Sequence, residues 1–156
     1  MKKKIAYIIS RFPTVSETFI LYEMLELKKL GMEIHVFPLI HQKGAVVHAE
    51  VQSIDPYVHY PKLLSLSTIR DHFYWFTKRP FVYVQTGMKV LIKNIRSPKF
   101  FSRAVVVLLQ SAHTARQINE LGVQHMHAHS ATHPTLMAYI IQRLTDIPYS
   151  FTDSLF

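Results

Sequence analysis

The sequence predicts an α/β fold: a Rossmann-like, mainly parallel sheet with helices on both faces. Strand-like and helix-like segments alternate along the chain, as parallel βαβ architectures require. Residues 4–10 form a near-continuous apolar run, which is typical of a central parallel strand. The first strand, the first helix and the second strand together span about 36 residues, a suitable length for a right-handed crossover. We therefore expect residues 1–156 to form a single domain.

The first helix is expected over residues 16–30. Ser16 or Thr14 can cap its start, and apolar side chains then recur at helical spacing, which gives the helix one apolar stripe. Gly31 is well suited to the C′ position that ends a helix. A second strand is expected at residues 33–39.

The remaining elements are predicted from the positions of Pro and Gly residues, which end or begin helices, and from the spacing of apolar residues. Pro80 interrupts one helical region, Pro98 suits the start of a long helix, and Gly122 suits its end. Thr132 is the expected cap of the last helix. The expected segments are a loop at 40–61 with a short strand near 58–60, interrupted helix at 62–97, helix at 99–121, strand at 123–128, helix at 133–145 and a strand from Tyr149.

Composition limits the class of protein. The chain is 49% hydrophobic and 18% charged, which is a globular composition. It has no cysteine, so a disulfide framework, a thiolate metal site and a cysteine nucleophile are excluded. No run reaches the ~18 apolar residues of a spanning helix, and the basic N-terminus lacks a cleavage pattern. We expect a cytoplasmic protein, peripheral on the inner membrane face.

The basic charge is concentrated in one region. The chain carries a net charge of +8, and residues 70–103 hold eight Lys and Arg but only one Asp. Trp, Tyr and Phe side chains interleave with these charges, a pattern that suits a membrane interface. The alternative is a pair of helices with core aromatics and solvated lysines; nucleic acid is not expected, because no RNA- or DNA-binding motif accompanies the region. The candidate membrane or anion patch is Lys78, Arg79, Lys89, Lys93, Arg96, Lys99 and Arg103.

The loop after the first strand is a candidate binding site. It lies at the carboxyl end of a parallel strand, where open α/β sheets bind ligands, and the following helix start offers free backbone N–H groups. The alternative is that its polar residues only cap the helix. It lacks the GxGxxG spacing of a dinucleotide site, and no cofactor is expected. Its candidate residues are Arg11, Ser16, Glu17 and Thr18.

A run of histidines ends the strand at 123–128. His125, His127 and His129 alternate, so one face of a strand can present all three, with His133 four residues on. His127 and His129 fall at the ligand-binding end, where imidazole can bond hydroxyls or phosphate. A structural role is the alternative. Zinc would accept three imidazoles, but no carboxylate lies close in sequence, and no metal is expected.

Three segments of the chain form a recognisable set: residues 11–20 (RFPTVSETFI), residues 125–131 (HMHAHSA), and residues 134–139 (PTLMAY) leading to 147–152 (IPYSFT). Together they resemble glycosyltransferase family 4, and more narrowly the bacterial exopolysaccharide and colanic-acid transferases. The resemblance implies a GT-B fold, in which two Rossmann-like domains face each other across a cleft. The chain resembles the N-terminal, acceptor-side domain. The acceptor would be a saccharide or a lipid-linked saccharide.

The resemblance also implies what this chain lacks. In the family, the nucleotide-sugar is held largely by a C-terminal domain, and a cleft-facing histidine commonly follows the Phe-Thr of the last strand. Here Asp153 to Phe156 follow Phe151 and Thr152, without histidine, so the catalytic residue stays unassigned. We expect a truncated retaining transferase that has no turnover alone. The rival hypotheses are a non-enzymatic basic module that binds anionic membrane or polysaccharide, and a metal hydrolase that uses the histidines.

Overall fold

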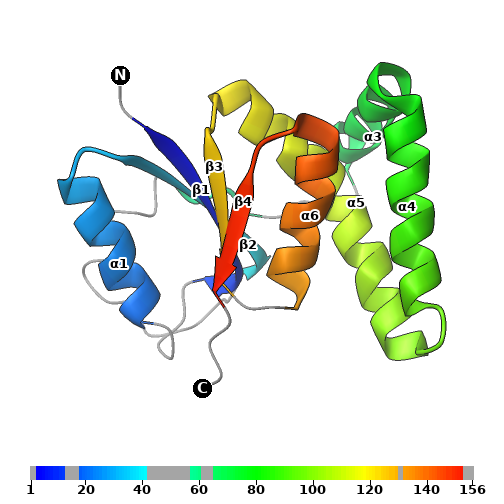
Figure 1. The fold of residues 1–156 in the computed structure, drawn as a ribbon, viewed down its shortest axis with the longest axis horizontal. Helices are drawn as coiled ribbons and strands as arrows, with labels where there is room; N and C mark the ends of the chain where they lie inside the picture. The colour runs from blue at the N-terminus through cyan, green and yellow to red at the C-terminus, as the bar shows by residue number, and fades with distance from the viewer. Residues whose placement is uncertain (1–2, 13–17, 42–56, 61–64, 130–131, 153–156) are drawn as a thin grey trace.

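The computed structural model describes residues 3–12, 18–41, 57–60, 65–129 and 132–152 (Figure 1). Within these residues lies a four-stranded, all-parallel sheet with strand order β2-β1-β3-β4. This confirms the predicted Rossmann-like α/β class. The strands are β1 (Lys4–Phe12), β2 (Glu33–His41), β3 (His125–His129) and β4 (Tyr149–Thr152), and the helices are α1 (Thr18–Lys29), α3 (Leu66–Lys78), α4 (Pro80–Asn94), α5 (Pro98–Leu121) and α6 (His133–Thr145).

Helices cover both faces of the sheet, as predicted. Helix α1 lies on one face, while α5 and α6 lie on the other, with α3 and α4 on their outer side (Figure 1). Helices α1, α5 and α6 bury apolar side chains against the sheet, and α3 and α4 bury part of their surface against α5 and α6. The result is a layered domain with two hydrophobic cores, one on each side of the sheet.

Alternation along β1 explains its continuous apolar sequence. Tyr7 and Ile9 belong to the core under α1, whereas Ala6 and Ile8 belong to the core under α5 and α6. A central parallel strand is buried on both faces, so both sets of side chains must be apolar or find partners. Side chains also alternate along β3, so its three histidines, at every second position, share one face of the sheet.

Several element boundaries match the sequence prediction. Helix α3 ends at Lys78 and α4 begins at Pro80, which confirms the predicted break. Ser97 caps α5 through its side chain, and Gly122 ends that helix with φ 75°, a left-handed conformation that favours glycine. Strand β3 starts at His125 rather than at 123, because Val123 still closes the α5 terminus. Near residues 58–60, the structure shows a single parallel bridge between Val58 and Val36.

No helix among the described residues combines the length and apolarity needed to cross a bilayer. The longest, α5, carries polar side chains that contact neighbouring elements. One of them, Gln110, donates its side-chain N–H to the carbonyl of Leu39 at 3.1 Å and so ties α5 to β2.

Candidate functional site

The candidate site lies where the chain order of the sheet reverses. From β1 the chain passes to β2 on one side, and β3 pairs with β1 on the other side. Ligands of open α/β sheets bind at the carboxyl ends of the strands at such a switch point. The register places Tyr7 of β1 directly beside His127 of β3, so the two strands meet at the candidate residues.

The histidines of β3 face the α1 side of the sheet. His127 lies between two hydroxyls of β4, with Ser150 Oγ at 2.7 Å from Nδ1 and Thr152 Oγ1 at 2.9 Å from Nε2. His125 Nε2 is 2.9 Å from the same Ser150 oxygen. The imidazoles of His125 and His127 are thus within hydrogen-bonding distance of hydroxyls of β4 itself.

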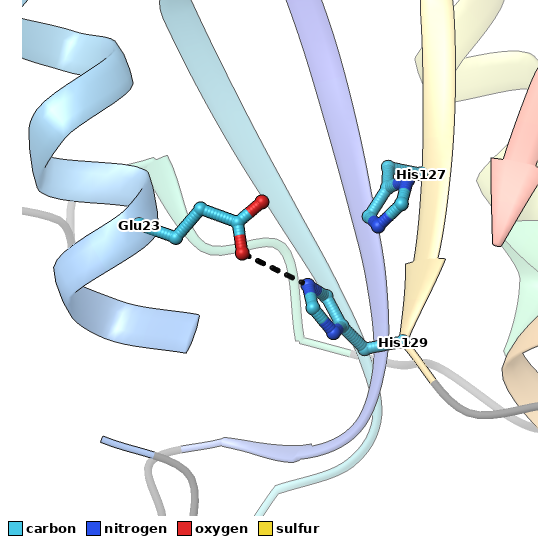
Figure 2. Close-up of side chains that lie close together, drawn as sticks. All are labelled: Glu23, His127 and His129. Atoms are coloured by element: carbon cyan, nitrogen blue, oxygen red, sulfur yellow. Dashed lines mark ion pairs between the residues drawn. The ribbon is translucent and has the colours of Figure 1, made fainter. Parts of the chain in front are cut away.

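Helix α1 adds a carboxylate that the sequence analysis missed. The Tyr7 hydroxyl donates to Glu23 Oε1 at 2.8 Å, and Glu23 Oε2 lies 3.7 Å from His129 Nε2 (Figure 2). Glu23 follows Ile20 by three residues and precedes Leu27 by four, which places it beside the apolar stripe that faces the sheet. That spacing was the available signal, because a glutamate on the edge of the stripe lies close enough to the sheet to reach a strand residue while it stays partly exposed.

Aromatic packing holds the site in place. The Tyr7 ring stacks on His129 with centroids 5.6 Å apart and meets His127 edge-on at 5.5 Å. His129 is buried, with 7% of its surface exposed, whereas 45% of the Glu23 side chain is exposed. The cluster thus has a rigid base on the sheet and an open side at α1.

Burial sets the protonation of these groups. It lowers the pKa of His127, and the neighbouring His129 lowers it further, while Glu23 opposes the change. Burial also lowers the pKa of His129 against the raising effect of Glu23. Burial first, then the hydrogen bond and charge of Glu23, raise the pKa of Tyr7. At neutral pH the site therefore holds neutral imidazoles, each with one N–H donor and one acceptor nitrogen.

We expect His127 and His129 to titrate below their ordinary pKa of 6.5. As the pH falls, the unfolded chain then takes up these protons before the folded protein does. The stability that they contribute is complete above pH 6.5 and is lost as the pH falls through the folded pKa values. NMR titration of the imidazoles measures both values directly. Glu23→Gln should lower them further, since it removes a nearby negative charge; a rise in either pKa would contradict this assignment.

The structure brings together only part of the predicted acceptor site. His127 and His129 share one cluster. Arg11 and Thr18 lie within β1 and α1, but their side chains are outside the described part of the structure. Ser16 and Glu17 fall outside the described residues altogether. The fourth histidine of the motif, His133, starts α6 and so belongs to the opposite face of the sheet.

His133 lines a separate cavity on that opposite face. The cavity has a volume of about 430 Å³ and lies between the ends of β1 and β2 and helices α5 and α6. Its polar lining includes Ser10, Gln110, His133 and Arg103. Arg103 therefore faces this cavity at the sheet edge, away from the other predicted patch residues on α3 and α4.

The predicted basic patch divides into anchored and exposed members. Arg79 joins the α3–α4 turn to the end of α6: its guanidinium donates to Asp146 at 2.9 Å and to the carbonyls of Arg143 and Leu144 at 3.1 Å. Lys78 donates to the Tyr74 hydroxyl at 2.9 Å. Lys78 is nevertheless exposed, as are the members on α4, in the α4–α5 connection and at the start of α5, which are Lys89, Lys93, Arg96 and Lys99.

The aromatic residues between positions 70 and 103 do not all lie in the core. This differs from the alternative of two helices with core aromatics and solvated lysines. Trp75 is buried and donates its indole N–H to the Ala112 carbonyl at 2.9 Å, but Phe73 is 68% exposed and Phe81 77% exposed. Helix α4 buries Val90 on its inner side and leaves an apolar stripe on its outer side. The exposed apolar residues of this stripe and its end are Phe81, Val84, Met88, Ile92 and Ile95.

Two chemical capabilities follow from the cluster of Glu23, His127 and His129. Neutral imidazoles and a carboxylate can exchange hydrogen bonds with hydroxyl groups, and the same groups can bind a cation. No protein-family model matches the chain, and no curated protein matches it significantly.

Proposed function

We propose that this chain is the acceptor-binding domain of a family-4-type glycosyltransferase for cell-surface polysaccharide. The observation that carries the proposal is the cluster of His127, His129 and Glu23 at the carboxyl end of β3, beside β1. An α/β sheet of this topology binds ligands at that edge. The substrate class, a saccharide or lipid-linked saccharide, comes from the resemblance of residues 11–20 and 125–131 to that family.

The site is chemically suited to sugar hydroxyls. His127 already lies within hydrogen-bonding distance of two side-chain hydroxyls, those of Ser150 and Thr152, so an acceptor hydroxyl can replace Thr152 without a change in the kind of bond. The Tyr7 hydroxyl donates a hydrogen bond to one carboxylate oxygen of Glu23. The other carboxylate oxygen can accept a hydrogen bond from a sugar hydroxyl. The Tyr7 ring adds an apolar surface behind these polar groups.

In this proposal the nucleotide-sugar donor is held by a second, C-terminal domain. Departure of its diphosphate needs positive charge and backbone dipoles, which lower the barrier by stabilising the charge that develops. The groups of the cluster are two neutral imidazoles and a carboxylate, which suit an acceptor hydroxyl better than a diphosphate. The 156-residue chain is accordingly expected to bind an acceptor without transferring sugar.

We expect the chain to bind neutral oligosaccharides at this cluster. His129→Ala removes a buried group behind the site, and Glu23→Gln replaces one carboxylate oxygen by an NH2 group and removes the charge, so each should weaken binding about 10-fold, the effect of roughly one charged hydrogen bond. Saturation-transfer NMR with a panel of hexose oligosaccharides, in the presence of a chelator, measures this binding. Glu26→Gln, one turn along α1 and exposed, is the matched control.

Equal binding by Glu23→Gln, His129→Ala and the parent chain would place any saccharide elsewhere. Failure of every oligosaccharide in the panel to bind would count against the acceptor role itself.

A second function is favoured by the outer surface of α4: docking on an anionic membrane. Its apolar stripe alternates with lysines, and the interfacial helices of peripheral proteins combine these two features. Such docking is compatible with a transferase that meets lipid-linked acceptors, and it also describes the alternative of a non-enzymatic basic module. Flotation with anionic vesicles separates this surface from the histidine site, because the two lie on opposite sides of the sheet (Figure 1).

A further inference from the structure

We propose that Glu23, His127 and His129 form a binding site for a divalent transition-metal ion, with Zn²⁺ the best fit. Each residue offers one ligand atom, and the three atoms lie within 4.8 Å of one another (Figure 2). The inference is independent of the proposed sugar binding. It reverses the sequence-based expectation of no metal, which rested on the lack of a carboxylate close in sequence to the histidines.

The spacing of the ligand atoms suits a small ion. Ligands held ~2.0–2.1 Å from zinc in tetrahedral geometry lie roughly 3.3–3.5 Å from one another. Glu23 Oε2 and His129 Nε2 are 3.7 Å apart, close to that separation and longer than a hydrogen bond. All three ligand atoms lie within 4.8 Å of one another, so a side-chain shift on the order of 1 Å, of the kind common on binding, completes the set.

The donor set points to a particular class of metal. Two imidazoles and one carboxylate are the protein ligands of many catalytic zinc sites and of related iron sites, whereas Mg²⁺ and Ca²⁺ prefer oxygen ligands alone. Three protein ligands leave at least one position for a water or hydroxyl oxygen. The exposed Glu23 side chain gives the ion a route from solvent, while the buried His129 forms the inner wall.

The ligands are oriented by neighbouring groups in the way that metal sites require. The Tyr7 hydroxyl bonds Glu23 Oε1 and so turns Oε2 towards His129. Ser150 bonds Nδ1 of His127, which leaves Nε2 as the ligand nitrogen. Such outer contacts fix the tautomer and direction of metal-bound groups. Thr152, now 2.9 Å from Nε2, is the group that a metal would displace.

The supporting elements come from distant parts of the chain. Glu23 is carried by α1 and the histidines by β3, with Tyr7 on β1 between them. All three elements belong to the packed sheet and its covering helix, so the ligands are not held by a loop. Metal binding would therefore join α1 to β3 across β1 and stabilise the domain.

Direct titration tests the site. We would titrate the full chain, without an affinity tag and after chelator treatment, with Zn²⁺ by calorimetry and with Co²⁺ by visible absorption. We expect one ion per chain and a cobalt spectrum of low coordination number. Glu23→Gln and His129→Gln should each weaken binding at least 10-fold, and Tyr7→Phe should weaken it about 10-fold through the orientation of Glu23.

Two matched controls address the other histidines and carboxylates of the chain. Glu26→Gln changes an exposed α1 carboxylate one turn away, and His59→Gln changes an imidazole that bonds His35 instead. Both should bind zinc like the parent chain. If His129→Gln fails to fold, as NMR spectra would show, Glu23→Gln at the open side of the site still decides the question.

Absence of stoichiometric binding, or binding that survives Glu23→Gln and Tyr7→Phe unchanged, would overturn the proposal. Equal weakening in the two control variants would do so too, because the ions would then be scattered among surface groups. The metal titration contains no saccharide, and the saccharide assay contains chelator, so either proposal can fail without the other.

Discussion

Replacing Asp71 by alanine is expected to lower the free energy of unfolding by about 3 kcal/mol, near the lower end of the range for breaking a buried ion pair. Asp71 lies on α3 with only 1% of its surface exposed. On α5, His113 Nδ1 lies 2.6 Å from one carboxylate oxygen, and Arg116 donates to the other at 2.9 Å. The loss falls at the lower end because Arg116 retains access to water.

Urea denaturation followed by circular dichroism measures this loss. The matched control is Glu120→Gln, which removes the exposed carboxylate that bonds the same Arg116 at 3.2 Å. An exposed pair of this kind contributes about 0.5 kcal/mol or less. If Asp71→Ala lowered the free energy of unfolding as little as Glu120→Gln, α3 would be held to α5 by apolar packing alone.

The pH dependence of stability provides an independent signature of the same network. Burial alone would raise the pKa of Asp71, but the hydrogen bonds and charges of His113 and Arg116 outweigh it and lower the pKa below 3.8. The contribution of Asp71 is thus complete above pH 3.8 and is lost as the pH falls through the lowered value. Asp71→Asn should remove this part of the acid dependence.

Neutralising Lys89, Lys93 and Arg96 to glutamine is expected to weaken binding to anionic vesicles roughly 100-fold, at about 1 kcal/mol for each charge near the surface. All three side chains are exposed beside the apolar stripe of α4. Phe81→Ser together with Ile92→Ser should weaken binding as well, since these exposed side chains would enter the lipid interface. High salt should weaken the parent chain more than the neutralised variant.

Co-flotation with phosphatidylcholine vesicles, with and without phosphatidylglycerol, provides the measurement. The matched control is the pair His127→Gln and His129→Gln, which should leave binding intact because β3 is remote from the outer side of α4. Equal binding to vesicles with and without phosphatidylglycerol would contradict the proposed docking. Concentration-dependent dimerisation that Phe81→Ser abolishes would instead identify the stripe as a contact between two protein chains.

The order and type of the elements could be predicted from the sequence. Strand β1, the break at Pro80, the glycine that ends α5 and the span of α6 all reflect chemistry within a few neighbouring residues. Such signals are local: a period of 3.6 or a continuous apolar run, a cap, or a residue with an unusual backbone preference. The two faces of the sheet then follow from the alternation of β and α segments.

The site itself was only half predictable. The alternate spacing of His127 and His129 placed them on one face at the end of a strand, and the structure confirms that placement. The sequence did not reveal that Ser150 and Thr152 would bond His127, because that depends on the register between β3 and β4. It also left open whether the aromatic side chains of residues 70–103 lie in the core, whereas the structure exposes Phe81 on α4.

What the sequence by itself determined was the succession of strands and helices, the concentration of basic charge and the strand-end position of the histidines. Only the tertiary structure decided which side chains lie next to those histidines. Glu23 reaches His129 because α1 crosses the face of the sheet above β1, and β1 pairs with a strand more than a hundred residues later. A carboxylate and an imidazole so far apart share no local pattern; packing alone brings them within 3.7 Å.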